Sequence, residues 1–184
     1  MDAYIFESER LGFREWTLDD LDFFATMNNK DSVMKYFPTK LSRQESEAFL
    51  QRIILHFDNH GYGLYATEIK ETGELIGFIG FQIATFYARF TPCVEIGWRL
   101  DDKFWNKGYA TEGAKAALKY GFNYLNLQKV YSFTPKINQG SVKVMEKIGL
   151  KYQENFNHPK VKEASELCSH VLYLMLHNEY NNNC

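Results

Sequence analysis

Residues 95–112 of this 184-residue chain read EIGWRLDDKFWNKGYATE. The first six residues end a predicted strand that begins near Thr91, and Tyr109 begins a predicted helix that runs to about Leu125. Small residues dominate the buried stripe of this helix, so it is expected to lie close to a sheet. A strand, a short loop and a helix therefore follow one another here.

The start of this predicted helix has the features of an anion site. The first N–H groups of a helix have no partner inside it, and the helix dipole favours negative charge at that end. Gly108 lets an anion approach the backbone, Ala110 is small for the same reason, and Lys107 adds a charge. Both the P-loop pattern and the Gly-x-Gly-x-x-Gly pattern are absent. The local chemistry predicts a pyrophosphate ligand.

The distribution of charge agrees with a local anion. Between Lys103 and Lys151 the chain has nine lysines and two acids, a net charge of +7, whereas its total charge is only −2. The rest of the chain is therefore strongly acidic, which argues against nucleic acid and favours a compact anionic cofactor. A solvated lysine face on two helices remains the alternative interpretation.

The composition predicts one domain over residues 1–180 and a disordered tail at 181–184, since no repeat or linker divides the chain. No apolar run approaches the roughly 20 residues of a membrane span, and early acids argue against a secretory signal. The three cysteines are far apart and lack metal spacing. We therefore expect a cytoplasmic protein with no membrane partner.

The predicted element order is β-α-α-β-β-β-α-β-α-β-β, a mixed α/β sheet. An opening strand covers 4–16, and two capping boxes, at Thr17 and Ser42, begin the first two helices. A loop containing Tyr36 and Phe37 separates these helices. Residues 62–83 read as a hairpin, and the later elements are a strand at 129–134, a helix at 138–148, and strands at 152–156 and 171–176.

Three blocks of this chain resemble the GNAT superfamily of acetyltransferases. Residues 105–112 look like its acetyl-CoA pyrophosphate loop, in a form similar to the RimJ/RimL branch, which includes acetyltransferases of ribosomal-protein N-termini. Residues 138–150 resemble a second family block, and residues 32–37 weakly resemble the start of the acceptor region. The chain departs from the pattern at Trp105, Asp102 and Asn106, where the family often has Gln or Arg, Pro and Gly. The resemblance covers most of residues 8–176.

The resemblance implies an α+β GNAT fold. Its central sheet is mixed and mostly antiparallel, with about seven strands, helices on both faces and splayed central strands. It also implies acetyl-CoA as cosubstrate and no metal. The residues that it places on the cofactor are Trp98, Leu100, Trp105, Asn106, Lys107, Gly108, Tyr109, Ala110, Thr111, Asn138 and Ser141.

Acetyl transfer to an amine needs a group that removes the proton of the amine and one that protonates the departing thiolate. The resemblance suggests Glu95 as the base, acting through water, although a strand glutamate in an ion pair is the simpler interpretation. Ser141 is the candidate acid. Asn138 and Ser141 equally suit helix capping.

The acceptor is predicted to be a protein or peptide N-terminus, or a small amine, with Tyr36 and Phe37 at its site. A sensor or adaptor that binds acyl-CoA without turnover is the alternative from another class. His56 and His60 have the i, i+4 spacing of metal ligands but lack a third partner. A monomer or a homodimer is expected.

Overall fold

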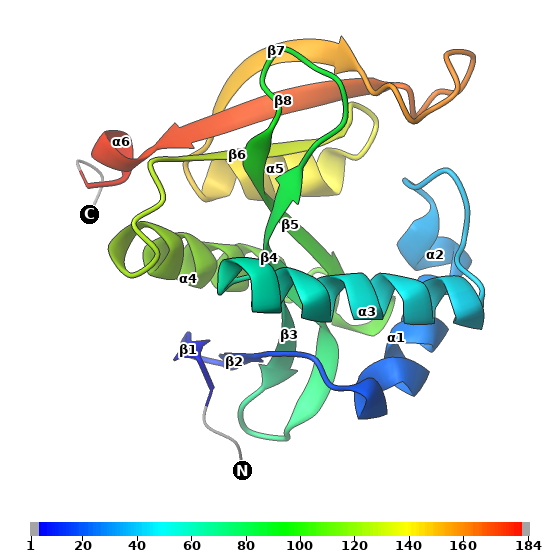
Figure 1. The fold of residues 1–184 in the computed structure, drawn as a ribbon, viewed down its shortest axis with the longest axis vertical. Coiled ribbons are helices and arrows are strands. Elements are labelled where there is room, and N and C mark those ends of the chain that lie inside the picture. Colours follow the sequence, from blue (N-terminus) through cyan, green and yellow to red (C-terminus); the bar gives the residue numbers. More distant parts are fainter. Residues whose placement is uncertain (1–3, 182–184) are drawn as a thin grey trace.

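The computed structural model describes residues 4–181, in which eight strands form one sheet in the order β1-β2-β3-β4-β5-β6-β8-β7 (Figure 1). The strands are β1 (Phe6–Glu7), β2 (Leu11–Arg14), β3 (Leu64–Ile69), β4 (Glu74–Ala84), β5 (Cys93–Leu100), β6 (Lys129–Pro135), β7 (Lys151–Asn157) and β8 (Ser169–Leu176). The α-helices are α1 (Leu21–Asn28), α2 (Asp31–Met34), α3 (Arg43–His60), α4 (Tyr109–Asn123), α5 (Gln139–Lys147) and α6 (His177–Asn181). Two 3₁₀ helices, η1 (Leu18–Asp20) and η2 (Asp102–Phe104), precede α1 and α4.

The sheet is antiparallel except at its centre, where β5 and β6 run parallel. The ladder between β4 and β5 extends from the pair Gly77–Leu100 to the pair Ala84–Cys93. In contrast, the ladder between β5 and β6 has the single register pair Glu95–Tyr131. The two central strands therefore separate toward the C-terminal end of β5, and the predicted splay is confirmed.

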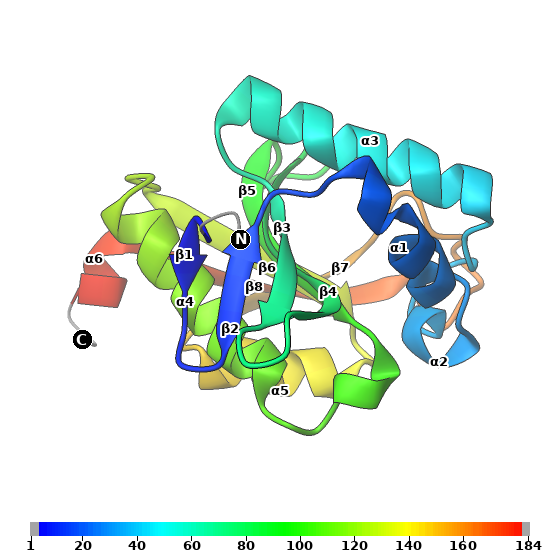
Figure 2. The same ribbon diagram turned by 90° about the horizontal axis from the view of Figure 1, so that it is seen from below.

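Helices cover both faces of the sheet, as predicted (Figure 2). On one face α4 packs closely, because a Cβ on its Gly113 would lie 2.3 Å from Ile79 Cδ1. On the opposite face Phe78 meets Phe24 of α1 and Phe49 of α3, with ring centroids 6.2 and 6.1 Å apart. The consecutive residues Phe78 and Ile79 of β4 therefore point to opposite faces of the sheet, and each contacts one of the two helical layers.

The second predicted capping box has the expected geometry. Ser42 Oγ accepts from the backbone N–H of Glu45 at 3.2 Å, and the Glu45 carboxylate accepts from the N–H of Ser42 at 2.7 Å. These bonds satisfy N–H groups that α3 leaves unpaired at its start. The helix ends at Gly61, which adopts the left-handed conformation with φ 72°.

The structure differs from the predicted order at three places. The opening strand is a hairpin of β1 and β2, which gives the sheet one strand more than the seven expected. The short helix α2 lies in the predicted loop, and α6 follows β8. Of the predicted tail, residue 181 ends α6, and residues 182–184 lie outside the described part of the chain.

Candidate active site

The loop between β5 and α4 curls through two residues with positive φ. Asn106 has φ 60° and Gly108, the N-cap of α4, has φ 83°. The indole N–H of Trp105 donates to the carbonyl of Leu100 at 2.9 Å and fixes the beginning of the loop. Asn106 therefore adopts the left-handed conformation that Asn tolerates better than most residues.

The start of α4 presents free backbone donors. The first intrahelical bond runs from Glu112 N–H to Gly108 C=O at 3.0 Å, so the N–H groups of Tyr109, Ala110 and Thr111 have no acceptor within the helix. The side chain of Lys107 is exposed beside them, and its Nζ lies 5.4 Å from the ring centroid of Phe104. These groups fit a pyrophosphate, as their sequence suggests.

Arg10, from the turn between β1 and β2, braces this loop. Its Nε donates to Glu112 at 2.7 Å, its Nη2 donates to the carbonyl of Lys107 at 3.1 Å, and its guanidinium lies 4.4 Å over the ring of Tyr109. Burial alone would raise the pKa of Glu112, but hydrogen bonds from Ser8 and Arg10 outweigh it and lower the pKa. The carboxylate therefore stays ionised and paired beside the anion site. The sequence pattern missed Arg10, because 102 residues separate it from Glu112.

The splay of the sheet leaves backbone groups of β5 unpaired by β6. The N–H of Asp101 bonds to Ile76 of β4 at 2.8 Å, so Trp98 and Leu100, which alternate with Asp101, direct their backbone groups to the β6 side. The hydroxyl of Ser132 reaches the carbonyl of Ile96 at 2.9 Å, near the last point of contact. The carbonyl of Leu100 already accepts from Trp105. The backbone of Trp98 and the N–H of Leu100 thus face the gap.

Asn138 and Ser141 lie at the start of α5, where the side chain of Asn138 caps the helix. Asn138 Oδ1 accepts from the N–H of Ser141 at 3.3 Å, and Asn138 Nδ2 donates to Ser141 Oγ at 3.1 Å and to Thr134 at 3.0 Å. Ser141 Oγ also lies 3.3 Å from the indole N–H of Trp98. The structure therefore brings Trp98, Asn138 and Ser141 together, and the capping role is present.

Glu95 is buried in the middle of β5, with 8% of its surface exposed. Gln82 of β4, its cross-strand partner, donates from Nε2 to Glu95 Oε2 at 2.8 Å. Burial raises the pKa of Glu95 to about 7, and the bond from Gln82 opposes this shift. Glu95 forms no ion pair in the described structure. Gln82 was not among the predicted site residues, although a polar side chain within an apolar strand was a signal that could have identified it.

Arg99 follows Glu95 on the same face of β5. Its guanidinium lies 4.0 Å over the ring of Phe37, and its Nη1 donates to Asn28 Oδ1 at 2.7 Å. Phe37, a predicted acceptor residue, is thereby held on the same face of the sheet as Glu95, and 38% of its surface is exposed. The other predicted acceptor residue, Tyr36, is half-buried and stacks under Lys35.

The two acids that precede the loop face the α1–α2 connection. Lys30 Nζ lies 2.6 Å from Asp101 and 3.1 Å from Asp102, and Ser32 donates to Asp102 at 2.6 Å. The pKa of Asp102 is lowered to about 2 by the Ser32 and Lys30 bonds. These contacts therefore tie the start of the loop to Lys30 and Ser32, between α1 and α2.

Other candidate residues have structural partners. His56 uses both ring nitrogens, at 2.7 Å from the carbonyl of Tyr62 and at 3.2 Å from the N–H of Ile83, which leaves no lone pair for a metal. Among the described residues, no group of three His, Cys, Asp or Glu side chains could hold a metal ion. Within the same part of the chain, no helix is both long and apolar enough to cross a membrane.

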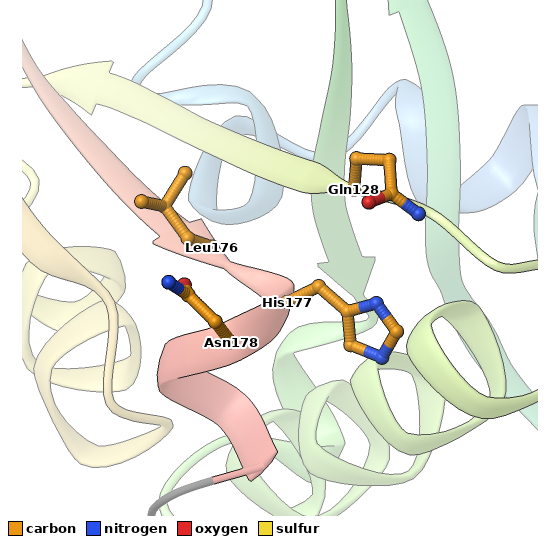
Figure 3. A pocket seen from close by; sticks show the side chains of 4 residues that line it. All are labelled: Gln128, Leu176, His177 and Asn178. Carbon is orange, nitrogen blue, oxygen red and sulfur yellow. The ribbon is translucent and has the colours of Figure 1, made fainter.

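A surface hollow of about 440 Å³ lies where β8 runs into α6 (Figure 3). It is lined by Gln128, Leu176, His177 and Asn178, and none of these is a predicted site residue. The ring of His177 stacks on Phe122 of α4, with centroids 5.5 Å apart. The hollow thus lies apart from the predicted chemistry.

Comparison with known proteins identifies relatives of this chain. The family model described as "Acetyltransferase (GNAT) domain" matches residues 10–151. An uncharacterized N-acetyltransferase, YnaD, from Bacillus subtilis is 29% identical over 177 residues, covering 95% of this chain and 98% of the relative.

Two solved structures resemble the whole chain. A GNAT-family acetyltransferase from Bacillus anthracis has a TM-score of 0.78 at 28% identity, covering 95% of this chain and 99% of the other. A spermidine N-acetyltransferase from Vibrio cholerae, in complex with CoA and spermine, has a TM-score of 0.75 at 23% identity, covering 94% and 99%.

Proposed function

Because the chain belongs to the GNAT family of N-acetyltransferases, in its RimJ/RimL-like branch, we propose that it transfers an acetyl group from acetyl-CoA to a primary amine. The amine is a protein or peptide N-terminus or a small molecule, and it attacks the thioester directly. Acetyl-CoA supplies the activated acetyl group.

The cofactor phosphates are assigned to the first turn of α4. The donors are the N–H groups of Tyr109, Ala110 and Thr111, with Lys107 and Arg10 adding positive charge. Backbone donors at a helix start bind phosphate without a specific side chain. The unpaired backbone groups of Trp98 suit hydrogen bonds with an amide-containing arm of the cofactor, which would lie along β5 like an added strand.

Glu95 is assigned the role of base, and its environment is the observation that carries this proposal. A general base works best when its pKa lies near the working pH. Burial raises the pKa of Glu95 to about 7, so about half of the carboxylates are ionised at neutral pH. The pair with Gln82 occupies one carboxylate oxygen, and the other is left to accept a proton from the amine or from a water.

Ser141 is assigned the role of acid. A hydroxyl has one proton and two lone pairs. The oxygen of Ser141 accepts from Trp98 and from Asn138, so both lone pairs are engaged and its proton is free to donate. The hydroxyl oxygen lies 3.3 Å from the indole nitrogen of Trp98, the residue whose backbone is left unpaired by β6. A donor at this position neutralises negative charge on a departing sulfur.

Thermal unfolding with acetyl-CoA, compared with ATP and NAD, tests cofactor binding. Acetyl-CoA at about 100 times its dissociation constant stabilises the fold by roughly 2.7 kcal/mol, and ATP and NAD leave the midpoint unchanged. The absence of a shift with acetyl-CoA would contradict the cofactor assignment.

Release of free thiol from acetyl-CoA in the presence of a panel of amines then tests turnover. Glu95→Gln is expected to lower turnover by roughly 10²–10⁴-fold while acetyl-CoA still raises the unfolding midpoint. Binding without thiol release from any amine would favour a sensor or adaptor instead.

A further inference from the structure

Six rings gather over the part of the sheet between β6 and β7 and form what we call the aromatic patch. They come from the loop between β4 and β5, from β6 and from the end of β7, and are Phe86, Phe90, Tyr131, Phe133, Phe156 and His158. Centroids of contacting pairs lie between 4.4 Å, for Phe86 and His158, and 6.2 Å, for Phe86 and Phe156. The ring of Phe133 is perpendicular to that of Phe86.

The patch lies on the same face of the sheet as Glu95. Glu95 and Tyr131 are paired in parallel register, so their side chains point to one face, and Phe133 follows Tyr131 by two residues. Neighbouring strands lie about 5 Å apart, and a step of two residues along a strand is about 7 Å. Tyr131 and Phe133 therefore lie on the strand adjacent to the proposed base, and their rings are on the same face of the sheet as its side chain.

The described helices leave this part of the face open. Figure 1 shows α5 behind β6, β8 and β7, and the loop between β4 and β5 in front of them. The contacts of Phe86 with Phe133 and Phe156 place this loop on the face of Glu95. All six ring-bearing side chains remain partly exposed. A cluster of partly exposed rings beside the proposed base is a candidate binding surface.

The charges around the patch disfavour a second ammonium group. Burial, together with His170 and Lys160, lowers the pKa of His158 to about 4, so its ring is neutral. Lys129 Nζ lies 5.7 Å over the ring of Tyr131, and Arg89 lies in the loop that carries Phe86 and Phe90. The acid on this face of β7 is Glu154, which is exposed. Three cations, Lys129, Arg89 and Lys160, therefore stand near the rings, against the carboxylates of Glu154 and Glu95, and Glu95 is the one assigned to the reacting amine.

We propose that the aromatic patch binds an aromatic group carried by the acceptor, so that the acceptor is a small arylalkylamine rather than a polyamine. The inference rests on the proposed acetyltransferase function, because it places the amine at Glu95. The ring of the acceptor then lies against Phe90 and Phe133, whose centroids are 6.1 Å apart, on the strand side next to Glu95. Stacking and edge-to-face contacts supply the affinity.

The test compares kcat/KM for 2-phenylethylamine, ethylamine and spermidine. The expected result is that 2-phenylethylamine exceeds both of the others by at least about tenfold, the effect of one aromatic contact and its burial. Thermal unfolding with CoA and 2-phenylethylamine provides a readout that needs no turnover. Equal or better use of spermidine would overturn the inference while leaving the acetyltransferase proposal intact, whereas no thiol release from any amine would contradict that proposal itself.

The variants Phe156→Ala and Phe86→Ala are expected to lose this preference while keeping their rate with ethylamine. Tyr152→Ala is the matched control, because Tyr152 is an exposed aromatic residue of the same strand that packs on Tyr173, on the α5 side of the sheet. If Phe156→Ala does not fold, Phe156→Leu keeps an apolar side chain, and a smaller loss of the preference is expected. An unchanged preference in folded Phe156→Ala would contradict the role of the patch.

A second copy of this chain is the other possible occupant of the patch, and sedimentation distinguishes it. A wild-type dimer that Phe156→Ser converts into a monomer with unaltered acceptor preference would overturn the inference. We expect the wild type and Phe156→Ser to have the same oligomeric state.

Discussion

The indole N–H of Trp98 lies 3.3 Å from the hydroxyl oxygen of Ser141 and joins β5 to α5 across the gap in the sheet. The backbone ladder between β5 and β6 has ended at Glu95 and Tyr131, and this side-chain contact links β5 to α5 beyond that point. The same contact occupies a lone pair of Ser141 and leaves its proton free. The splay and the proposed acid are therefore linked through one side chain.

Replacing Ser141 by Ala tests that link. We expect kcat to fall by roughly 10–100-fold, because the proposed proton donor is lost, and KM for acetyl-CoA to change less. Ser141→Thr keeps the hydroxyl and is the matched control. If Ser141→Ala melts at a lower temperature but turns over at the normal rate, Ser141 only caps α5.

The acid limb of the pH profile should report Glu95. Burial raises the pKa of Glu95 to about 7, and the ionised form is the base, so log(kcat/KM) is expected to rise with pH and level off above about 7. The limb is measured with wild-type protein and with Gln82→Leu. Removing the Gln82 amide takes away a bond that favours the carboxylate, so the midpoint should move to higher pH. A midpoint near 4.5 in both proteins would contradict the role of Glu95.

The burial of Glu95 should also cost stability at high pH. Its folded-state pKa lies above its unfolded value, so the native state is favoured below pH 4.5 and loses stability as pH rises through about 7. Glu95→Gln removes this dependence. At pH 8 the variant is expected to be more stable by up to about 3 kcal/mol, the linkage value for this shift. Urea unfolding at pH 8 and pH 5 measures the difference, which should shrink at the lower pH.

Arg10 is expected to support acetyl-CoA binding from outside the phosphate loop. Arg10→Ala removes the cation that pairs with Glu112, leaves that carboxylate with only the hydrogen bonds from Ser8 and the backbone, and releases the carbonyl of Lys107. The dissociation constant for acetyl-CoA should rise about tenfold, which is the usual effect of one hydrogen bond to a charged group. Calorimetric titration measures the dissociation constant.

Lys70→Ala is the control for Arg10, because Lys70 is a cation beside the same hairpin whose partner is Glu7. It should bind acetyl-CoA like the wild type. Equal losses of affinity in both variants would mean that general charge, and not the contact with the loop, accounts for the effect.

Gly108 should matter for the cofactor beyond its effect on the fold. Its φ of 83° makes Gly108→Ala unfavourable by about 1–2 kcal/mol, and the new Cβ would lie 3.4 Å from Nη2 of Arg10, which braces the loop. Gly73→Ala is the matched control, since Gly73 has φ 69°, open space around its Cβ position and a place in the β3–β4 turn. Both variants should lose thermal stability, and only Gly108→Ala should lose affinity for acetyl-CoA.

The sequence by itself determined the elements whose signals are local. The capping box at Ser42, the strand before Asp101 and the helix start at Gly108 depend on residues within a few positions of one another. Spacing along the chain is enough to predict such elements, because their hydrogen bonds and periodicity are set over one or two turns. The same local patterns carried the family resemblance and named Glu95 as a candidate.

Tertiary structure alone decided which distant residues share the site. Arg10 reaches Glu112 across 102 residues, and Phe86 meets Phe133 and Phe156 across three segments. The opening hairpin likewise turns at Ser8, whose hydroxyl donates to Glu112 at 2.7 Å. Because this contact is distant in sequence, the strand pattern did not show that the opening strand is broken there. Packing between elements depends on the orientation of whole strands and helices, which short-range spacing does not encode.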